Sequence, residues 1–136
     1  MRICDCHAHV GQFDDHMSGH RAAYSPQALL SEMDSAGVDL AVVSNISAID
    51  DPGGANDEMA AWARRYPRLI PLMWVTPEIS RPEKVFEYLG IGFRGVKLHP
   101  TAGKYRADCA AVHPLLDVCR EAHVPALFHC AADEFS

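Results

Sequence analysis

The sequence has little positive charge, no long apolar run and an odd number of cysteines. With 12 Lys and Arg against 18 Asp and Glu, its formal net charge is -6. Nucleic acid is therefore not an expected partner, because phosphate binding needs a basic surface. No run of about 18 apolar residues is present, so no membrane-spanning helix is expected. Five cysteines form an odd set, and an odd count does not favour a disulfide framework.

A secretory signal is also missing from the start of the chain. Met1 leads directly into a strand-like segment, without a basic region followed by an apolar stretch. Together with the cysteine count, this predicts a cytoplasmic protein. Cys4 and Cys6 would share one face of that strand, and their spacing is not the usual Cys-x-x-Cys of metal or redox sites. We interpret them as small buried side chains rather than ligands.

Apolar strands and amphipathic helices alternate along the chain at intervals of about 30 residues. The 136 residues contain no linker or low-complexity segment, so a single domain over residues 1–136 is predicted. Alternating strands and helices favour an α/β fold with a parallel sheet covered by helices. The expected strands are Arg2–Val10, Val38–Ser44, Leu69–Thr76, Phe93–His99 and Pro125–His129.

The connecting segments carry recognisable start and stop signals. Ser25 and Pro26 predict the beginning of a helix that Gly37 ends. Residues 11–24, before this helix, form a polar loop in this interpretation. Asn56 is expected to cap a second helix that runs to about Tyr66, and further helices are expected over 82–89 and 112–122.

The first candidate site is Asp5-x-His7-x-His9. Side chains two residues apart on a strand point to the same face, so both imidazoles can reach one metal ion. Asp5 lies on the same side and could orient a ligand. The alternative is a pair of polar residues where a strand runs into a loop, but the position before Gly11, at the end of a buried strand, favours a functional role.

Two later strands end in residues of similar chemistry. His129 ends the fifth strand, and ligands of parallel α/β folds bind at the carboxyl ends of strands. It could complete a three-histidine set, since catalytic zinc has three protein ligands and a water. Lys97 and His99 alternate with apolar residues on the fourth strand and point inward. Lys97 could be a carbamylated metal bridge, a cation for the substrate or an ion-pair partner, and His99 could contact substrate or support the ligands.

Three motifs resemble the amidohydrolase superfamily, in particular its amidohydrolase-2 branch. They are Asp-Cys-His-Ala-His-Val-Gly at 5–11, Arg-Gly-Val-Lys-Leu-His-Pro at 94–100 and Pro-Ala-Leu-Phe-His-Cys at 125–130. This branch contains metal-dependent TIM-barrel hydrolases and decarboxylases. The resemblance implies that His7, His9 and His129 are metal ligands, that the metal is divalent and most simply Zn²⁺, and that the substrate is a small molecule. A bound metal would lower the pKa of its water and make hydroxide available.

A complete (β/α)₈ barrel needs about 250 residues. The chain is therefore expected to be an incomplete TIM-barrel-like domain, truncated at about five βα units of eight. The family's sixth-strand His and eighth-strand Asp have no counterpart here, so the chain is predicted to be a hydrolase that is incomplete as a catalyst. The alternative is a non-catalytic half-barrel that serves as a binding or oligomeric module. Open sheet edges favour association, which predicts a homo-oligomer, most simply a dimer.

Overall fold

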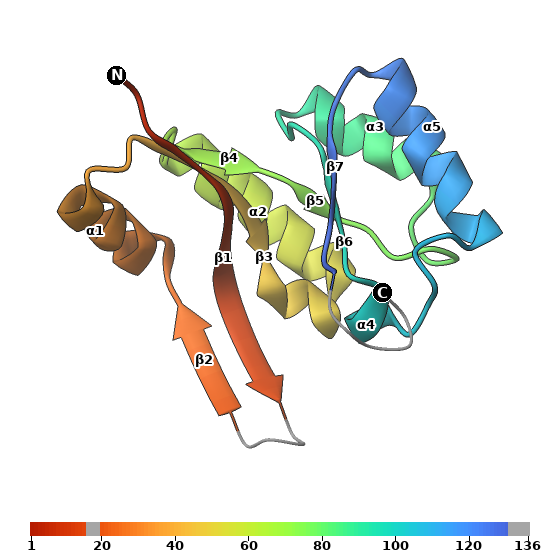
Figure 1. The fold of residues 1–136 in the computed structure, drawn as a ribbon, viewed down its shortest axis with the longest axis horizontal. Coiled ribbons are helices and arrows are strands. Elements are labelled where there is room, and N and C mark those ends of the chain that lie inside the picture. The colour runs from red at the N-terminus through yellow and green to blue at the C-terminus, as the bar shows by residue number, and fades with distance from the viewer. Residues whose placement is uncertain (16–19, 131–136) are drawn as a thin grey trace. The chain divides into compact units, whose positions relative to one another are not determined.

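The structure is a computed structural model that describes residues 1–15 and 20–130. The chain forms two compact units, one over Met1–Pro71 and one from Leu72 onward (Figure 1). The first unit contains β1 (Cys4–Asp15), β2 (His20–Tyr24), α1 (Pro26–Ala36), β3 (Leu40–Asn45), the 3₁₀ helix η1 (Ile46–Ile49), α2 (Pro52–Arg65) and β4 (Leu69–Pro71). The second contains β5 (Met73–Trp74), α3 (Pro82–Gly90), β6 (Val96–Leu98), α4 (Pro100–Gly103), the 3₁₀ helix η2 (Ala110–Val112), α5 (His113–Glu121) and β7 (Ala126–Phe128).

The first unit is built on a four-stranded sheet with the order β2-β1-β3-β4. β1 pairs in parallel with β3, and β3 pairs in parallel with β4. Helix α2 packs against β3 and β4, as Figure 1 shows. Val10, Ala41, Val43 and Met59 are fully buried and form the core beneath this helix.

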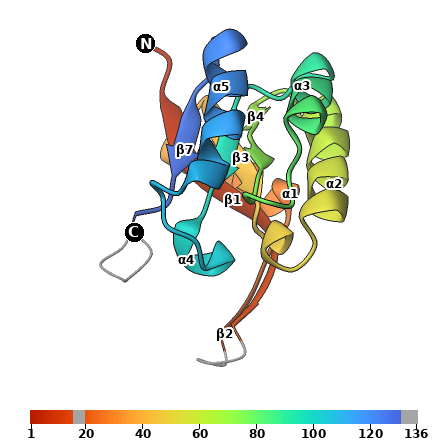
Figure 2. The same ribbon diagram turned by 90° about the vertical axis from the view of Figure 1, so that its right-hand side faces the viewer.

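The second unit is built on a three-stranded sheet with the order β5-β6-β7, and both pairs are parallel. Helices α3 and α5 pack against each other (Figure 2). Val75, Val85, Val96 and Leu98 are fully buried in this unit. Parallel strands joined through helices confirm the predicted α/β class. Among the described residues, no helix is long and apolar enough to cross a bilayer.

The first helix begins and ends where its capping residues predict. The Ser25 side chain accepts a hydrogen bond from the Ala28 N–H at 3.1 Å, and Pro26 occupies the first helical position. Gly37 ends the helix with φ +70°, a left-handed conformation that glycine adopts without strain. These signals are local, which explains why the sequence alone located this helix.

The predicted polar loop over residues 11–24 was wrong. β1 continues to Asp15 and pairs antiparallel with β2, with Gly11 opposite Tyr24 and Asp15 opposite His20. The hairpin is visible in Figure 1. Residues 16–19 of the predicted loop lie outside the described residues. The segment lacks apolar alternation, so its strands are defined by backbone pairing that no side-chain pattern reveals.

Two further boundaries differ from the prediction. Helix α2 is capped by Asp51, whose Oδ1 accepts from the Gly54 N–H at 3.0 Å, whereas Asn56 is buried inside the helix. The single strand expected over Leu69–Thr76 is two strands, β4 and β5, in different sheets. Pro71 ends β4, because proline has no N–H to donate to a ladder.

The expectation that Cys4 and Cys6 are buried was also wrong, since both are exposed. Asp5 pairs with Ala41 and Ala8 pairs with Val43. The chain advances three residues along β1 while it advances two along β3, so β1 contains one extra residue. This β-bulge reverses the side that the following residues take. The two cysteines therefore do not share the buried face on which Val10 lies.

Candidate functional site

The same bulge shapes the His-x-His segment of β1. The His7 N–H donates to Asp5 Oδ1 at 2.9 Å, so the Asp5 carboxylate fixes the backbone next to the first histidine. A bulge often re-aims a side chain at a functional position. Here the bulge lies at the histidine pair, and the imidazoles of His7 and His9 point to the same place.

The rings of His7 and His9 converge through their Nε2 atoms, which lie 3.1 Å apart. The ring centroids are 4.9 Å apart and the rings are inclined at 72°. Two ligands at about 2.05 Å from one ion are about 2.9 Å apart in octahedral and about 3.4 Å apart in tetrahedral geometry. The observed separation lies between these values, so the pair fits a divalent metal ion of either geometry. It also suits a hydrogen bond in which one ring donates to the other.

Ser44 supports the second histidine. Its Oγ lies 3.0 Å from His9 Nδ1, and its side chain is only 2% exposed at the end of β3. When the ring donates its Nδ1–H to Ser44, its Nε2, which lies 3.1 Å from His7 Nε2, is the unprotonated nitrogen that can bind a metal ion. Sequence reasoning missed Ser44. The available signal was a hydroxyl at the carboxyl end of an otherwise apolar strand, in register with His9.

In the second unit, three aromatic rings stack at the ends of three neighbouring strands. The Trp74 and His99 centroids are 5.6 Å apart, and those of His99 and His129 are 3.8 Å apart, with nearly parallel rings. His99 Nδ1 also accepts a hydrogen bond from the Ala102 N–H at 3.2 Å. His99 is therefore held on both faces and at one edge, and it fixes the ring of His129 by stacking.

Lys97 lies on β6 between Trp74 of β5 and Leu127 of β7. Its side chain is fully buried. Burial lowers the pKa of the Lys97 ammonium from 10.5 to about 8, although the nearby Cys130 thiol acts in the opposite direction. Buried amines with a lowered pKa are common at functional sites, because they can gain or lose a proton near neutral pH.

The structure thus brings the predicted residues together in two pairs, His7 with His9 and His99 with His129, which belong to different compact units. Over residues 1–15 and 20–130, no group of three or more His, Cys, Asp or Glu is arranged to hold a metal ion. The complete set of His7, His9 and His129 stays a prediction.

An apolar cavity borders the first pair. It has a volume of about 480 Å³ and is lined by Ala8, His9, Tyr24, Ala28, Leu29 and Glu32. Cavities of 300–1,000 Å³ with mostly apolar walls are typical of small-molecule sites. The position of His9 on its wall links this cavity to the histidine pair.

Comparison with known proteins connects this arrangement to one family. The family model described as amidohydrolase matches residues 4–135. The chain belongs to the amidohydrolase family. This confirms the resemblance carried by the three motifs. No curated protein matches this amidohydrolase chain.

Solved structures share its fold. A 5-carboxyvanillate decarboxylase from Novosphingobium aromaticivorans, solved with bound manganese, is 18% identical with a TM-score of 0.72, and the match covers 96% of this chain and 51% of that one. A 2,6-dihydroxybenzoate decarboxylase from Rhizobium is 18% identical with a TM-score of 0.70, and the match covers 98% of this chain and 51% of that one. A probable 2-pyrone-4,6-dicarboxylic acid hydrolase from Acinetobacter baumannii is 19% identical with a TM-score of 0.66, and the match covers 96% of this chain and 50% of that one.

The TM-scores of these matches establish a common fold. The chain spans about half the length of these structures. This agrees with the prediction of an incomplete TIM-barrel-like domain, since the matched half contains parallel strands alternating with helices.

Proposed function

We propose that this amidohydrolase chain contributes His7 and His9 to a divalent metal site for hydrolysis or decarboxylation of a small molecule. The observation that carries the proposal is the 3.1 Å separation of their Nε2 atoms, with His9 held by the buried Ser44. A bound divalent ion would polarise the substrate and make hydroxide available near neutral pH. His129 is the proposed third ligand, on the basis of its sequence motif.

The chain's own residues would prepare this site. Asp5 fixes the backbone at His7. When Ser44 Oγ accepts the Nδ1 proton of His9, the ring adopts the tautomer whose Nε2 can bind a metal ion.

The proposed metal is a divalent ion, with zinc favoured by the all-histidine ligand set. Manganese is the alternative, because it is bound in the similar decarboxylase from Novosphingobium. The His7–His9 separation is compatible with both. Competition between the two metals during titration would distinguish them.

The proposed substrate is a small ring compound that carries a carboxylate. The similar structures include two decarboxylases and a probable hydrolase whose names describe such compounds. Lys97 would provide positive charge for the carboxylate, since its pKa of about 8 leaves it mostly protonated at pH 7. His99 would act as a substrate contact or by holding His129, with which it stacks.

The test is metal binding by the purified chain and its single-histidine variants. Calorimetric titration with Zn²⁺ and Mn²⁺ should give stoichiometric binding to the native chain. His7→Ala and His9→Ala should each weaken it by at least tenfold, because each removes a ligand. His123→Ala, which changes an exposed histidine, is the matched control and should bind normally. Metal content unaffected by both ligand substitutions would refute the proposal.

His129→Ala tests the third ligand separately. Weaker metal binding would support the three-histidine set, and unchanged binding would restrict the site to His7 and His9. Turnover of a panel of carboxylated ring acids and lactones then separates the two functional alternatives. Turnover by the metal-loaded chain would exclude the non-catalytic module. The homo-oligomer and the cytoplasmic location stay predictions, and light scattering would test the first.

A further inference from the structure

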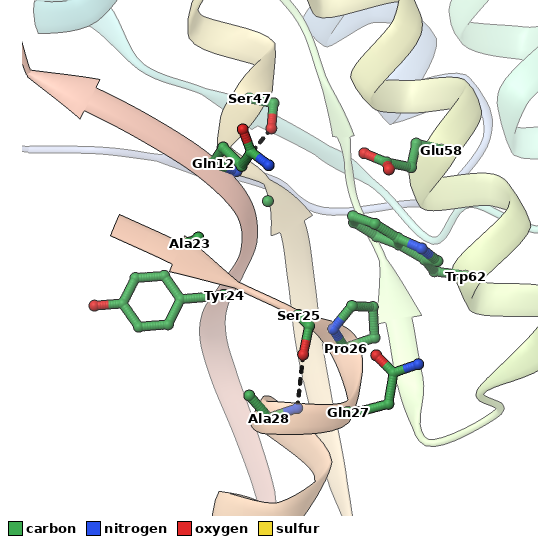
Figure 3. A pocket seen from close by; sticks show the side chains of 11 residues that line it. Gln12, Ala23, Tyr24, Ser25, Pro26, Gln27, Ala28, Ser47, Glu58 and Trp62 are labelled. Carbon is green, nitrogen blue, oxygen red and sulfur yellow. Dashed lines mark hydrogen bonds between the residues drawn. The ribbon is translucent and has the colours of Figure 1, made fainter. Parts of the chain in front are cut away.

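A second cavity in the first unit differs chemically from the one beside His9. It has a volume of about 390 Å³ and is bordered by β1, the end of β2, the first turn of α1, η1 and α2. Figure 3 shows Glu58 and Trp62 projecting into it from α2, with Gln12 and Ser47 opposite Glu58 and Pro26 near the indole. None of the described lining residues is Lys or Arg.

The Glu58 carboxylate is held in place by a buried amide. Asn45 is 1% exposed, and its Nδ2 donates to Glu58 Oε2 at 3.0 Å and to the Ala55 carbonyl at 3.1 Å. Its Oδ1 accepts from the Ser47 N–H at 3.0 Å. All three contacts fix the orientation of Asn45, which in turn fixes one carboxylate oxygen at the cavity. The other oxygen is left to interact with a ligand.

Trp62 follows Glu58 by one helical turn, so the two side chains lie on the same face of α2. An indole attracts a cation through the negative face of its ring, by about 0.5–2 kcal/mol. The half-buried Trp62 ring and Pro26 supply apolar walls on the same side of the cavity. A carboxylate beside an indole is the pairing that recognises an organic cation.

The first turn of α1 acts in the opposite direction, since a helix N-terminus carries partial positive charge. Its donors are largely satisfied within the helix. The Ala28 N–H is bonded to Ser25 Oγ at 3.1 Å, the Leu29 N–H is bonded to the Ser25 carbonyl at 3.1 Å, and Pro26 has no N–H. The full negative charge of the Glu58 carboxylate therefore outweighs the partial positive charge of the α1 N-terminus, whose N–H groups are largely paired.

We propose that this cavity binds a small organic ammonium ion. The ammonium donates to the Glu58 carboxylate, and the apolar body of the ligand packs against Trp62 and Pro26. Neither His7 nor His9 lines this cavity, although Tyr24 and Ala28 border both it and the cavity beside His9. It is independent of the proposed metal-dependent function.

The experiment uses three probes of the same shape and different charge: phenethylamine, 2-phenylethanol and 3-phenylpropanoate. The chain has two tryptophans, so its NMR spectrum contains two indole N–H signals, and Trp62→Phe assigns one of them. Phenethylamine should shift the Trp62 signal in a saturable manner at pH 7. The alcohol and the acid should bind at least tenfold more weakly, because the alcohol carries no charge to form a charge-assisted pair with the carboxylate and the acid is repelled by it.

Glu58→Gln is the central variant, because it removes the charge and keeps an oxygen that can accept from Asn45. It should weaken phenethylamine binding by about tenfold. Glu121→Gln makes the same chemical change at an exposed carboxylate that lines neither cavity and should leave binding unchanged. Trp62→Leu, followed by calorimetry, should weaken binding about fivefold and serves as a second test if Glu58→Gln does not fold.

Three results would overturn the proposal. The alcohol or the acid could bind as tightly as the amine, which would make the cavity apolar or anion-selective. Glu58→Gln could bind the amine like the native chain. His9→Ala could abolish amine binding, which would place the ligand at the histidine pair instead.

Discussion

Replacing the buried lysine of β6 is expected to stabilise the second unit at neutral pH and to flatten the pH dependence of its stability. The Lys97 side chain is fully buried, and burial lowers its pKa from 10.5 to about 8. Below pH 8 the ammonium is charged in the folded and the unfolded chain, so the folded state carries the full desolvation penalty. Above pH 10.5 the amine is neutral in both states and the penalty disappears.

Between these pH values the unfolded chain binds more protons than the folded chain. The free energy of unfolding therefore rises with pH in this window. A pKa difference of 2.5 between 10.5 and about 8, at about 1.4 kcal/mol per pKa unit, corresponds to about 3 kcal/mol. Lys97→Met has a similar volume and no charge, so its stability advantage over the native chain should shrink by about 3 kcal/mol between pH 7 and 10.5.

Urea unfolding at several pH values, followed by tryptophan fluorescence, measures this difference. In a Trp62→Phe background the signal comes from Trp74, the buried neighbour of Lys97 across the β5–β6 ladder. Burial raises the pKa of the Cys119 thiol. The unfolded chain therefore loses this proton at lower pH than the folded chain, and the free energy of unfolding falls as pH rises. This contribution is common to both proteins and cancels in their difference.

Lys84→Met is the control, because Lys84 is exposed on α3 and its substitution removes no buried ammonium. The difference in unfolding free energy between Lys97→Met and the native chain could instead stay constant to about 0.5 kcal/mol from pH 7 to 10.5. That result would show that the ammonium is not desolvated on folding. The reasoning from burial would then be wrong.

Substitutions at four other positions test the first unit by urea unfolding. Gly11→Ala should cost more than about 2 kcal/mol, because a Cβ there would lie 1.9 Å from Asn45 Oδ1 and the residue has φ +103°. Gly37→Ala, at φ +70° with open space around it, should cost only about 1 kcal/mol, and equal losses at the two glycines would contradict the steric argument. Ser25→Ala should cost about 1 kcal/mol through loss of the helix cap, and Ser25→Asp should restore most of it. Arg68→Met should cost about 1–2 kcal/mol, since Arg68 donates to the carbonyls of residues 38 and 39, and no loss would show that water replaces these bonds.

Local signals located the helices better than the strands. The Ser25 cap, the proline after it and the glycine at the end of α1 act within a few residues, so they can be interpreted from the sequence. Asp51 and Pro52 form an equally good helix start, but the adjacent glycines suggested a loop. The start of α2 was therefore placed too late, at Asn56.

Strand pairing depends on partners that are distant in sequence. The bulge in β1 exists only relative to β3, and the exposure of Cys4 and Cys6 depends on what packs against this part of β1. The hairpin partner of β1 and the division of Leu69–Thr76 between two sheets are equally non-local. No period-two pattern predicts these features, because they depend on backbone hydrogen bonds between segments.

By itself the sequence determined the α/β class, the family and the histidine pair of β1. Strand and helix periodicity, together with side-chain chemistry, is local information. The tertiary structure decided that Ser44 supports His9, that His99 stacks between Trp74 and His129, and that Lys97 is fully buried. Each of these properties depends on contacts between neighbouring strands, and those contacts exist only once the chain has folded.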